Sequence, residues 1–366
     1  MNAASLVDRL RGPVTEALKP VKRGWNLLTM PARRAKLAKT PHEIVFRENK
    51  WKLLRYTARP EGFAYATPVL LVPSLINRHY VLDLQPGKSL VEYLVAQGHD
   101  VFVIDWGKPG REDRLLTFDD VCDRYLGRAI REAARRSPDE RVHVLGYCLG
   151  GTLAAIHTAA NPKHVASLVA LAAPVTFHDD GLLSTWCRTK SFDINLLIDA
   201  LGNVPAPLMQ AAFQLLRPTL GLSKMVHTVD RSWNREFLDG FQALEHWGND
   251  NIPFPGEVFR TYIAELYQRD AFARGTFRLA GKPAKMESIR CPVLAITFEH
   301  DNIVPWKSAA LLIDRAGSRD KQRIHLNGGH VGAVVARAAA KGLWPQLSQF
   351  WAARDAAATA RARKAA

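Results

Sequence analysis

Short apolar runs alternate with stretches of helical periodicity along most of the chain. The runs are residues 69–72, 101–104, 142–145, 168–171, 293–296 and 323–326. Continuous runs of about four to six aliphatic, often β-branched residues are typical of strands that are buried on both faces of a parallel sheet. The segments between them repeat apolar residues at helical spacing, as in 89–96, 118–134 and 152–160. The alternation predicts a mostly parallel, doubly wound α/β sheet.

One interval breaks this alternation. Between residues 177 and 286 there is no convincing strand pattern, and amphipathic helical stretches recur at 194–201, 208–216 and 258–267. An insertion of this size between two strands predicts a helical cap; the alternative is a set of ordinary helices packed on the sheet. The expected parts are a basic N-terminal segment (1–40), an α/β core (41–176 and 287–354), the helical cap (177–286) and a flexible tail (355–366).

Composition narrows the classes of protein. The 366 residues carry a formal net charge of +15, part of it near the two ends. Three interpretations remain open: solvated basic tails, attraction to an anionic substrate such as a phosphate-bearing ester, and nucleic-acid binding. No reader motif for a specific nucleic acid is visible. No apolar run reaches the roughly 18–20 residues that a membrane-spanning helix needs, so a cytoplasmic protein is expected.

The four cysteines carry the first chemical signal. Their spacings contain no CxxC pair or Cys/His cluster, so we expect neither a disulfide framework nor a metal site. Cys148 stands apart because it lies in Gly146-Tyr147-Cys148-Leu149-Gly150-Gly151, directly after the third run and before a helix. The expectation for the other three cysteines is that they are inert.

The segment around Cys148 matches the nucleophile elbow G-x-S-x-G, with cysteine in place of serine. Its glycines permit a tight turn that lifts the central side chain above the sheet. The following helix directs free N–H groups at the site, which favours a thiolate and stabilises a developing oxyanion. The alternative is a buried, inert cysteine in a glycine-rich turn. The elbow context favours a nucleophile in an α/β-hydrolase fold.

An elbow of this kind predicts an acid and then a histidine later in the chain. Asp301 follows the fifth run and His330 follows the sixth, so each lies just past the carboxyl end of a predicted strand. His330 would take the proton of Cys148 or hold the thiolate as an ion pair, and Asp301 would fix the tautomer and orientation of the imidazole. Glu299 is the competing acid.

The oxyanion hole of such a site requires two backbone donors. The N–H of Leu149, directly after the nucleophile, is expected to be one. The other is expected from the loop that follows the first run, at Leu75 or Ile76.

Several stretches of the chain, including the motifs above, resemble those of one known family. The chain resembles the polyhydroxyalkanoate synthases in the stretch from Val72 to Leu84, which reads VPSLINRHYVLDL. It is also similar to them in Ser89-Leu90-Val91, Val103-Ile104-Asp105-Trp106-Gly107, the elbow, Asp301-Asn302-Ile303-Val304-Pro305-Trp306 and Gly328-Gly329-His330. The likeness runs through most of residues 68–350.

The resemblance implies a catalytic set of Cys148, Asp301 and His330. It also implies a substrate, the coenzyme A thioester of an (R)-3-hydroxyacid, typically 3-hydroxybutyryl, and no metal or redox cofactor. Coenzyme A release would accompany growth of a polyester chain. A thiol suits loading from coenzyme A, because exchange between thioesters is nearly isoenergetic, and a cap would exclude water from the intermediate.

The resemblance further implies partners. The segment before the core is too short to be the N-terminal domain of the long synthases, so the chain looks like the short catalytic subunits that work with a second, smaller subunit. A homodimer or hetero-oligomer on the surface of cytoplasmic polymer granules is the corresponding expectation. Two positions depart from the family's pattern: Asn302 stands where histidine is frequent, and Leu149 where the short subunits usually have glutamine.

Two other functions remain open at this point. A cysteine-type hydrolase, either a thioesterase or an enzyme that degrades the polymer, would use the same residues with water as the acceptor. A non-catalytic granule-associated protein would retain the fold without the reaction, although an intact set of Cys148, Asp301 and His330 argues against it.

Overall fold

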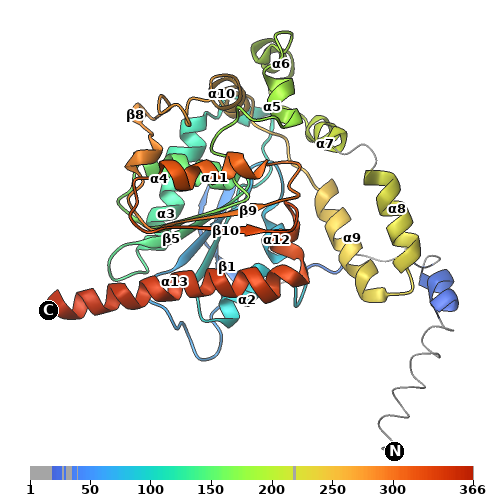
Figure 1. Ribbon diagram of the computed structural model, residues 1–366, viewed down its shortest axis with the longest axis horizontal. Helices are drawn as coiled ribbons and strands as arrows, with labels where there is room; N and C mark the ends of the chain where they lie inside the picture. The colour runs from blue at the N-terminus through green and yellow to red at the C-terminus, as the bar shows by residue number, and fades with distance from the viewer. Residues whose placement is uncertain (1–18, 27–28, 30–34, 39, 217–219, 366) are drawn as a thin grey trace, which may run out of the picture.

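The centre of the fold is a twisted sheet. The computed structural model describes residues 19–26, 29, 35–38, 40–216 and 220–365, and within them the main sheet has eight strands in the order β1-β2-β4-β3-β5-β6-β9-β10 (Figure 1). These are β1 (His42–Glu48), β2 (Trp51–Tyr56), β3 (Val69–Val72), β4 (Val101–Asp105), β5 (Val142–Tyr147), β6 (Val165–Leu171), β9 (Val293–Phe298) and β10 (Lys321–Leu326). From β4 to β10 neighbouring strands run parallel, which confirms the predicted sheet.

The hairpin of β1 and β2 is the part of the sheet that the hydrophobic pattern does not predict. Both strands pair antiparallel, β1 with β2 and β2 with β4. β1 is the edge strand, and its sequence HEIVFRE leaves most side chains exposed or half-buried. An edge strand with charged residues has no continuous apolar run, so the signal used for the six central strands is missing there.

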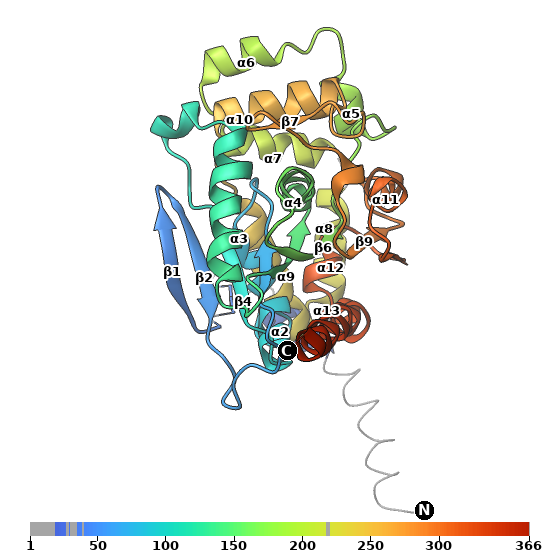
Figure 2. The ribbon, with the colours of Figure 1, turned by 90° about the vertical axis from the view of Figure 1, so that its left-hand side faces the viewer.

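Helices cover both faces of the sheet, as expected for a doubly wound fold (Figure 2). Leu70 and Val72 of β3 pack against the face covered by α3 (Leu126–Ala134) and α4 (Leu149–Ala160). Their neighbours Val69 and Leu71 pack against α2 (Leu90–Ala96) and α13 (Arg337–Ala365) on the opposite face. Since successive side chains of a strand point to opposite faces, one apolar run supplies both layers of the core.

The interval between β6 and β9 is mainly helical. It contains α5 (Leu182–Cys187), α6 (Ile194–Leu201), α7 (Ala206–Leu215), α8 (Leu220–Arg231), α9 (Arg235–Asn249), α10 (Gly256–Thr261) and the π-helix η5 (Tyr262–Gln268). Helices α5 to α9 form an arc at the upper right of Figure 1. A pair of two-residue strands, β7 (Arg278–Leu279) and β8 (Lys282–Pro283), also lies in this interval and has no counterpart in the sequence pattern.

The other elements connect the strands. They are η2 (His79–Asp83), η3 (Arg111–Leu115), the π-helix η4 (Asp120–Tyr125), η6 (Met286–Ser288), α11 (Trp306–Arg315) and α12 (Gly332–Val335). Within the described ranges, no helix combines the length and apolar composition that a membrane span requires.

The structure describes the two ends of the chain to different extents. Most of the predicted basic segment, 1–40, lies outside the described residues. At the other end, α13 continues as a helix to Ala365, past the predicted start of a flexible tail at 355. Asp355 belongs to the packed body because its buried carboxylate accepts hydrogen bonds from the backbone N–H groups of Ala66 and Thr67, at 3.2 and 2.8 Å.

Candidate active site

Cys148 occupies a strained turn between β5 and α4. Its backbone has φ 55° and ψ −130°, a region that side-chain-bearing residues rarely adopt. The turn is held by a hydrogen bond of 3.0 Å from the N–H of Cys148 to the carbonyl of Leu171 in the neighbouring strand β6. The thiol is half-buried and lines two pockets. Such strain in a strand–turn–helix context is the geometry of a nucleophile elbow.

The glycines of the elbow are required by close backbone contacts. A Cβ atom on Gly146 would lie 2.2 Å from the Cα of Gly151, and a Cβ on Gly150 would lie 2.2 Å from the carbonyl oxygen of Val72. A Cβ on Gly151 would lie 2.3 Å from the Cβ of Ala173. Each distance is far inside van der Waals contact, so α4 can approach β3 and β5 this closely only where side chains are absent.

Asp301 and His330 reach the same place from two other strands. Asp301 follows β9 and His330 follows β10, and Nδ1 of His330 lies 2.7 Å from Oδ2 of Asp301. The other carboxylate oxygen of Asp301 accepts from the N–H groups of Ile303 and Val304, both at 2.9 Å. His330 also forms a side-chain hydrogen bond with Cys148. Since Nδ1 is engaged by Asp301, Nε2 is the nitrogen available to the sulfur.

The electrostatics of this group favour a charged imidazole. Burial alone would lower the pKa of His330, but the charges of Cys148 and Asp301 and their hydrogen bonds raise it to about 10. The side chain of Asp301 is almost completely buried, so its carboxylate is weakly screened. An imidazolium between a sulfur and a carboxylate is the arrangement in which a thiolate is stabilised as an ion pair.

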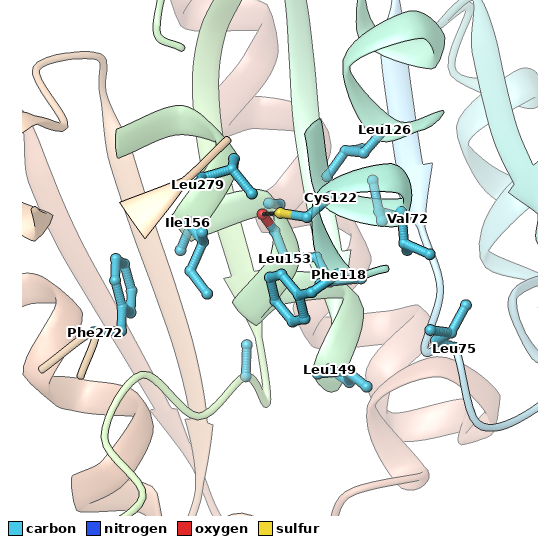
Figure 3. Packing of buried hydrophobic residues seen from close by; sticks show 14 of the residues in the cluster. Val72, Leu75, Phe118, Cys122, Leu126, Leu149, Leu153, Ile156, Phe272 and Leu279 are labelled. Carbon is cyan, nitrogen blue, oxygen red and sulfur yellow. Dashed lines mark hydrogen bonds between the residues drawn. The ribbon is translucent and has the colours of Figure 1, made fainter. Parts of the chain in front are cut away.

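The competing candidates have other surroundings. Glu299 lies 2.8 Å from Nε2 of His325, not beside His330. Cys122 is fully buried, and its sulfur donates to the carbonyl of Leu153 at 3.3 Å among apolar side chains (Figure 3). Burial raises the pKa of the Cys122 thiol well above its usual range, and raises that of Cys291 to about 11. Neither thiol has the partners that Cys148 has.

The expected oxyanion donors come from two segments, the start of α4 and the loop that follows β3. Leu149 is the first residue of α4, so its N–H has no acceptor within the helix. The N–H of Ile76 donates to Oγ of Ser74 at 3.2 Å. The N–H of Leu75 has no acceptor among the residues that the structure describes. Of the expected donors, the N–H groups of Leu149 and Leu75 are therefore the ones without an acceptor among the described residues.

The β3 loop, residues 73–78, is braced from two directions. On the sheet side, Nε1 of Trp106 donates to the carbonyl of Pro73 at 3.0 Å. On the side of α9, Nε1 of Trp247 donates to the carbonyl of Arg78 at 2.9 Å, and Asn77 donates to Asn251. The backbone that carries Leu75 is consequently fixed to both the core and the helical insertion.

Next to this loop lies a second pair of an imidazole and a carboxylate. Nδ1 of His79 is 3.0 Å from Oδ1 of Asp105 at the end of β4. Burial would raise the pKa of Asp105, but the hydrogen bond and charge of His79, with the N–H of Gly107, lower it to about 2. The pair lines neither pocket at Cys148, and it joins the start of η2 to the end of β4.

Two pockets meet at Cys148. The first, the open pocket, has a volume of about 270 Å³ and is lined by Cys148, His330 and side chains of α7 and α9, including Phe213 and Trp247. The second, the tight pocket, has a volume of about 30 Å³ and extends toward Phe177, Tyr262 and Tyr267. A reacting group on the sulfur can therefore reach a wider side and a narrow side whose wall is mainly apolar and includes four aromatic rings.

The pocket residues of the insertion were not found from the sequence. Phe213, Trp247, Tyr262 and Tyr267 each lie far from the elbow in the chain and have no motif of their own. The aromatic content of residues 177–286 was the available signal, but it does not say which rings face the sulfur. Among the described residues, no group of three or more His, Cys, Asp or Glu side chains is arranged to hold a metal ion.

Comparison with known proteins identifies both the fold and a family. Residues 67–335 match the family model for the alpha/beta hydrolase fold, and residues 34–94 match the model for the N-terminus of poly-beta-hydroxybutyrate polymerase (PhaC). Among solved structures, the chain is similar to a monoacylglycerol lipase of Paleococcus ferrophilus, with a TM-score of 0.53, 16% identity and coverage of 84% of this chain and 100% of that one. That likeness bears on the fold alone, which agrees with the predicted α/β-hydrolase class.

Three relatives are similar to this chain over most of their length and share one name, poly(3-hydroxyalkanoate) polymerase subunit PhaC. The relative from Haloferax mediterranei is 34% identical, with coverage of 95% of this chain and 73% of the relative. The relative from Allochromatium vinosum is 35% identical, covering 85% and 88%. The relative from Synechocystis sp. is 31% identical, covering 86% and 85%.

Proposed function

Because the chain belongs to the α/β-hydrolase-fold family of poly(3-hydroxyalkanoate) polymerase subunits, we propose that it polymerises (R)-3-hydroxyacyl groups from coenzyme A through a thioester on Cys148. It is an acyltransferase of polyhydroxyalkanoate biosynthesis. The proposal adds the chemical route, the residues that carry it and 3-hydroxybutyryl-coenzyme A as the substrate. Neither a metal ion nor a redox cofactor has a part in it.

The loading step begins with the ion pair of Cys148 and His330. The thiolate attacks the carbonyl carbon of the acyl-coenzyme A thioester, and the N–H groups of Leu149 and Leu75 donate to the resulting oxyanion. The tetrahedral intermediate collapses as its bond to the coenzyme A sulfur breaks. The departing thiolate takes a proton from the imidazolium of His330, which leaves an acyl group on Cys148 and a neutral imidazole.

The transfer step uses the same residues in reverse. The 3-hydroxyl of a second 3-hydroxyacyl group attacks the carbonyl carbon of the thioester on Cys148, and His330 takes the proton of that hydroxyl. The carbon–sulfur bond then breaks, which restores the thiolate and the imidazolium and forms one ester bond. Asp301 keeps Nδ1 of His330 protonated throughout, so Nε2 always faces the sulfur.

One observation carries this route. Cys148 lies at the strained elbow, with His330 hydrogen-bonded to it and Asp301 holding His330 at 2.7 Å. The pKa of His330 is raised to about 10, which supports an imidazolium at neutral pH. The loading step needs this charge beside the sulfur, because it begins from a thiolate. The helical insertion supports the role of a cap, because α7 and α9 contribute to the open pocket and would limit access of water to the thioester.

Incubation of the purified full chain with 3-hydroxybutyryl-coenzyme A tests the proposal. We expect coenzyme A release together with insoluble polyester, and loss of both in Cys148→Ala. Cys291→Ala, a buried cysteine outside the site, is the matched control and should retain activity. Release of free 3-hydroxybutyrate without polymer would identify a hydrolase instead.

A non-catalytic role at the granule gives a different result. A strain that carries only the Cys148→Ala protein would then accumulate polymer at the normal level. The route proposed here requires that strain to make none.

The partners belong to the proposal as well. We expect a second, smaller synthase subunit, a homodimer or hetero-oligomer, and binding to the surface of the growing polymer granule, with no specific nucleic acid. Two observations support this expectation. The relatives are named polymerase subunits, and this chain covers 88% of the subunit from Allochromatium vinosum. Purification of the tagged chain from its host, followed by identification of co-eluting proteins, tests the second subunit.

A further inference from the structure

Exposed apolar side chains gather on the helical insertion. Among the described residues, thirteen large apolar side chains are exposed, and eight of them lie on α5 to α8, which span only residues 182–231. These helices belong to the arc at the upper right of Figure 1. Single exposed apolar residues are normal on a protein surface, whereas a concentration of them marks an interaction site.

Helix α7 is the clearest case, because its polar and apolar sides are reversed. Its outward side, the α7 face, consists of Leu208, Ala211 and Leu215, which recur at helical spacing and are exposed, Leu208 at 44% and Leu215 at 60%. Gln210 and Gln214, on the other side of the helix, line the open pocket. A helix on the surface of a globular protein normally turns its polar side to water. The α7 face is therefore suited to an apolar partner.

Charge distinguishes the two helices whose side chains line the open pocket. α7 has the sequence APLMQAAFQL and carries no charged residue. α9 has the sequence REFLDGFQALEHWGN, which includes Arg235, Glu236, Asp239 and Glu245. An anionic lipid surface attracts basic residues, and the α7 face has none. Of the two walls, α7 is thus the one that matches an uncharged, apolar material.

The product of the proposed reaction is such a material, and the open pocket is its way out. The tight pocket, at about 30 Å³, has room for roughly one water molecule. The open pocket, at about 270 Å³, is smaller than the roughly 300–1,000 Å³ of sites that enclose drug-sized ligands. A growing polyester soon exceeds this volume and extends past the rim of the pocket. Gln214 lines the pocket and is exposed, and Leu215 of the α7 face follows it directly.

We propose that the α7 face binds the poly(3-hydroxyalkanoate) product where the chain leaves the open pocket, and so holds the enzyme on the polymer surface. The inference rests on the proposed function and deepens it, since it names the surface that meets the product. The contact is apolar and involves no covalent step.

Binding of the purified full chain to amorphous poly(3-hydroxybutyrate) particles tests this surface. The particles are sedimented, and the protein left in solution gives an apparent Kd. We expect the double variant Leu208→Gln/Leu215→Gln to bind at least tenfold more weakly, because two leucines no longer gain free energy by burial against the polymer. Glutamine and leucine have similar helix propensities, so α7 should still form.

Ile44→Gln is the matched control for the double variant. Ile44 is 45% exposed, similar to Leu208, but it lies on the edge strand β1 and not on the insertion. This variant should bind the particles as the wild type does. Equal weakening in the control and in the double variant would show a general loss of surface apolarity, and it would overturn the inference.

Two measurements on the wild type decide the question even if the double variant does not fold. Particle binding should not weaken between about 50 mM and about 500 mM NaCl, because no charge takes part in the contact. A strong loss with salt would mean that the net charge of +15 holds the protein on the particles, which contradicts the inference. Hydrogen exchange should slow in peptides from residues 206–215 when particles are added, and unchanged exchange there contradicts it as well.

Other occupants of the α7 face give other results. A wild type that is dimeric and a double variant that is monomeric, by light scattering, would assign the face to a second copy of the chain. Co-purification of a host subunit with the wild type but not with the double variant would assign it to that subunit. Either result, or particle binding that is absent in the wild type or unchanged in the double variant, overturns the inference.

The proposed function is tested separately from this surface. Acylation of Cys148 by 3-hydroxybutyryl-coenzyme A requires no particles, so its absence in the wild type contradicts the proposed function whatever the particles show. Acylation of Cys148 without particle binding leaves that function intact and removes only the role of the α7 face.

Discussion

Replacing Asp301 by asparagine tests the electrostatics of the site with almost no change of shape. In the structure, Oδ1 of Asp301 accepts from the N–H groups of Ile303 and Val304, and Oδ2 faces Nδ1 of His330. These two backbone donors determine the orientation of the asparagine side-chain amide in the variant. Its oxygen must face those donors, so its NH₂ group must face the imidazole. Nδ1 then becomes an acceptor, and the ring proton moves to Nε2.

This tautomer is the wrong one for the reaction. With a proton on Nε2, His330 cannot take the proton of Cys148 or of a substrate hydroxyl. The amide also carries no charge to stabilise the imidazolium. The pKa of about 10 against the usual 6.5 corresponds to about 5 kcal/mol in favour of the charged ring, shared between the sulfur and the carboxylate. Loss of the carboxylate part and of the tautomer predicts a fall in kcat of about 10²- to 10⁴-fold.

Two assays measure this effect on Asp301→Asn. Polymerisation from 3-hydroxybutyryl-coenzyme A gives kcat, and alkylation of Cys148 by iodoacetamide at pH 6–7 reports the thiolate. We expect alkylation to fall at least tenfold and to recover as pH rises, because hydroxide then removes the proton that His330 no longer takes. Glu299→Gln is the matched control, since Glu299 is a nearby carboxylate bound to His325. Retention of kcat within threefold in Asp301→Asn would refute the reasoning.

Three further predictions address the frame of the site. Gly150→Ala should abolish activity and lower the Tm, because the added Cβ would lie 2.2 Å from a backbone oxygen. Gly342→Ala is the control, since a Cβ there meets open space, and its Tm should stay unchanged or rise. Equal changes of Tm in the two variants would contradict this prediction. Burial lowers the pKa of His99 to about 4 and that of His143 to about 3. Below pH 6.5 the unfolded chain therefore binds protons at these residues that the folded chain does not. The free energy of unfolding should fall as the pH falls, by about 2 kcal/mol for each histidine at pH 5. Urea unfolding of the wild type and His143→Gln checks it, and equal pH slopes in the two proteins would refute it. Trp247→Phe should lower kcat about fivefold with little change in Tm, because one hydrogen bond to the β3 loop is lost. An unchanged kcat would show that this hydrogen bond does not position the loop for the reaction.

The central sheet follows from the sequence because its signal is local. β3, β5 and β9 are buried along their whole length, so a continuous apolar run marks each one. The elbow is local as well, since Gly146, Cys148 and Gly150 lie within five residues and their chemistry is written in their order. Prediction of Asp301 and His330 needed one further rule, which is that site residues lie at the carboxyl ends of parallel strands.

The features that the sequence did not predict depend on contacts between residues that only the folded chain brings together. The hairpin β1–β2 lies at an exposed edge, so charged residues interrupt its apolar pattern. Tyr262 and Tyr267 meet because of a π-helix, and a search at the usual helical period assigns them to different faces. Between Leu75 and Ile76 no choice was possible from residue types, because the hydrogen bond from Ile76 to Ser74 exists only in the folded loop.

The most direct test of the account is the site of acylation. Wild-type protein is quenched with acid within milliseconds to seconds of mixing with 3-hydroxybutyryl-coenzyme A, digested, and its peptides are weighed. We predict a 3-hydroxybutyryl thioester on the peptide that contains Cys148, formed no more slowly than polymer appears and absent from Cys148→Ala. An acyl group on another residue, or continued polymer synthesis by Cys148→Ala, would contradict the account.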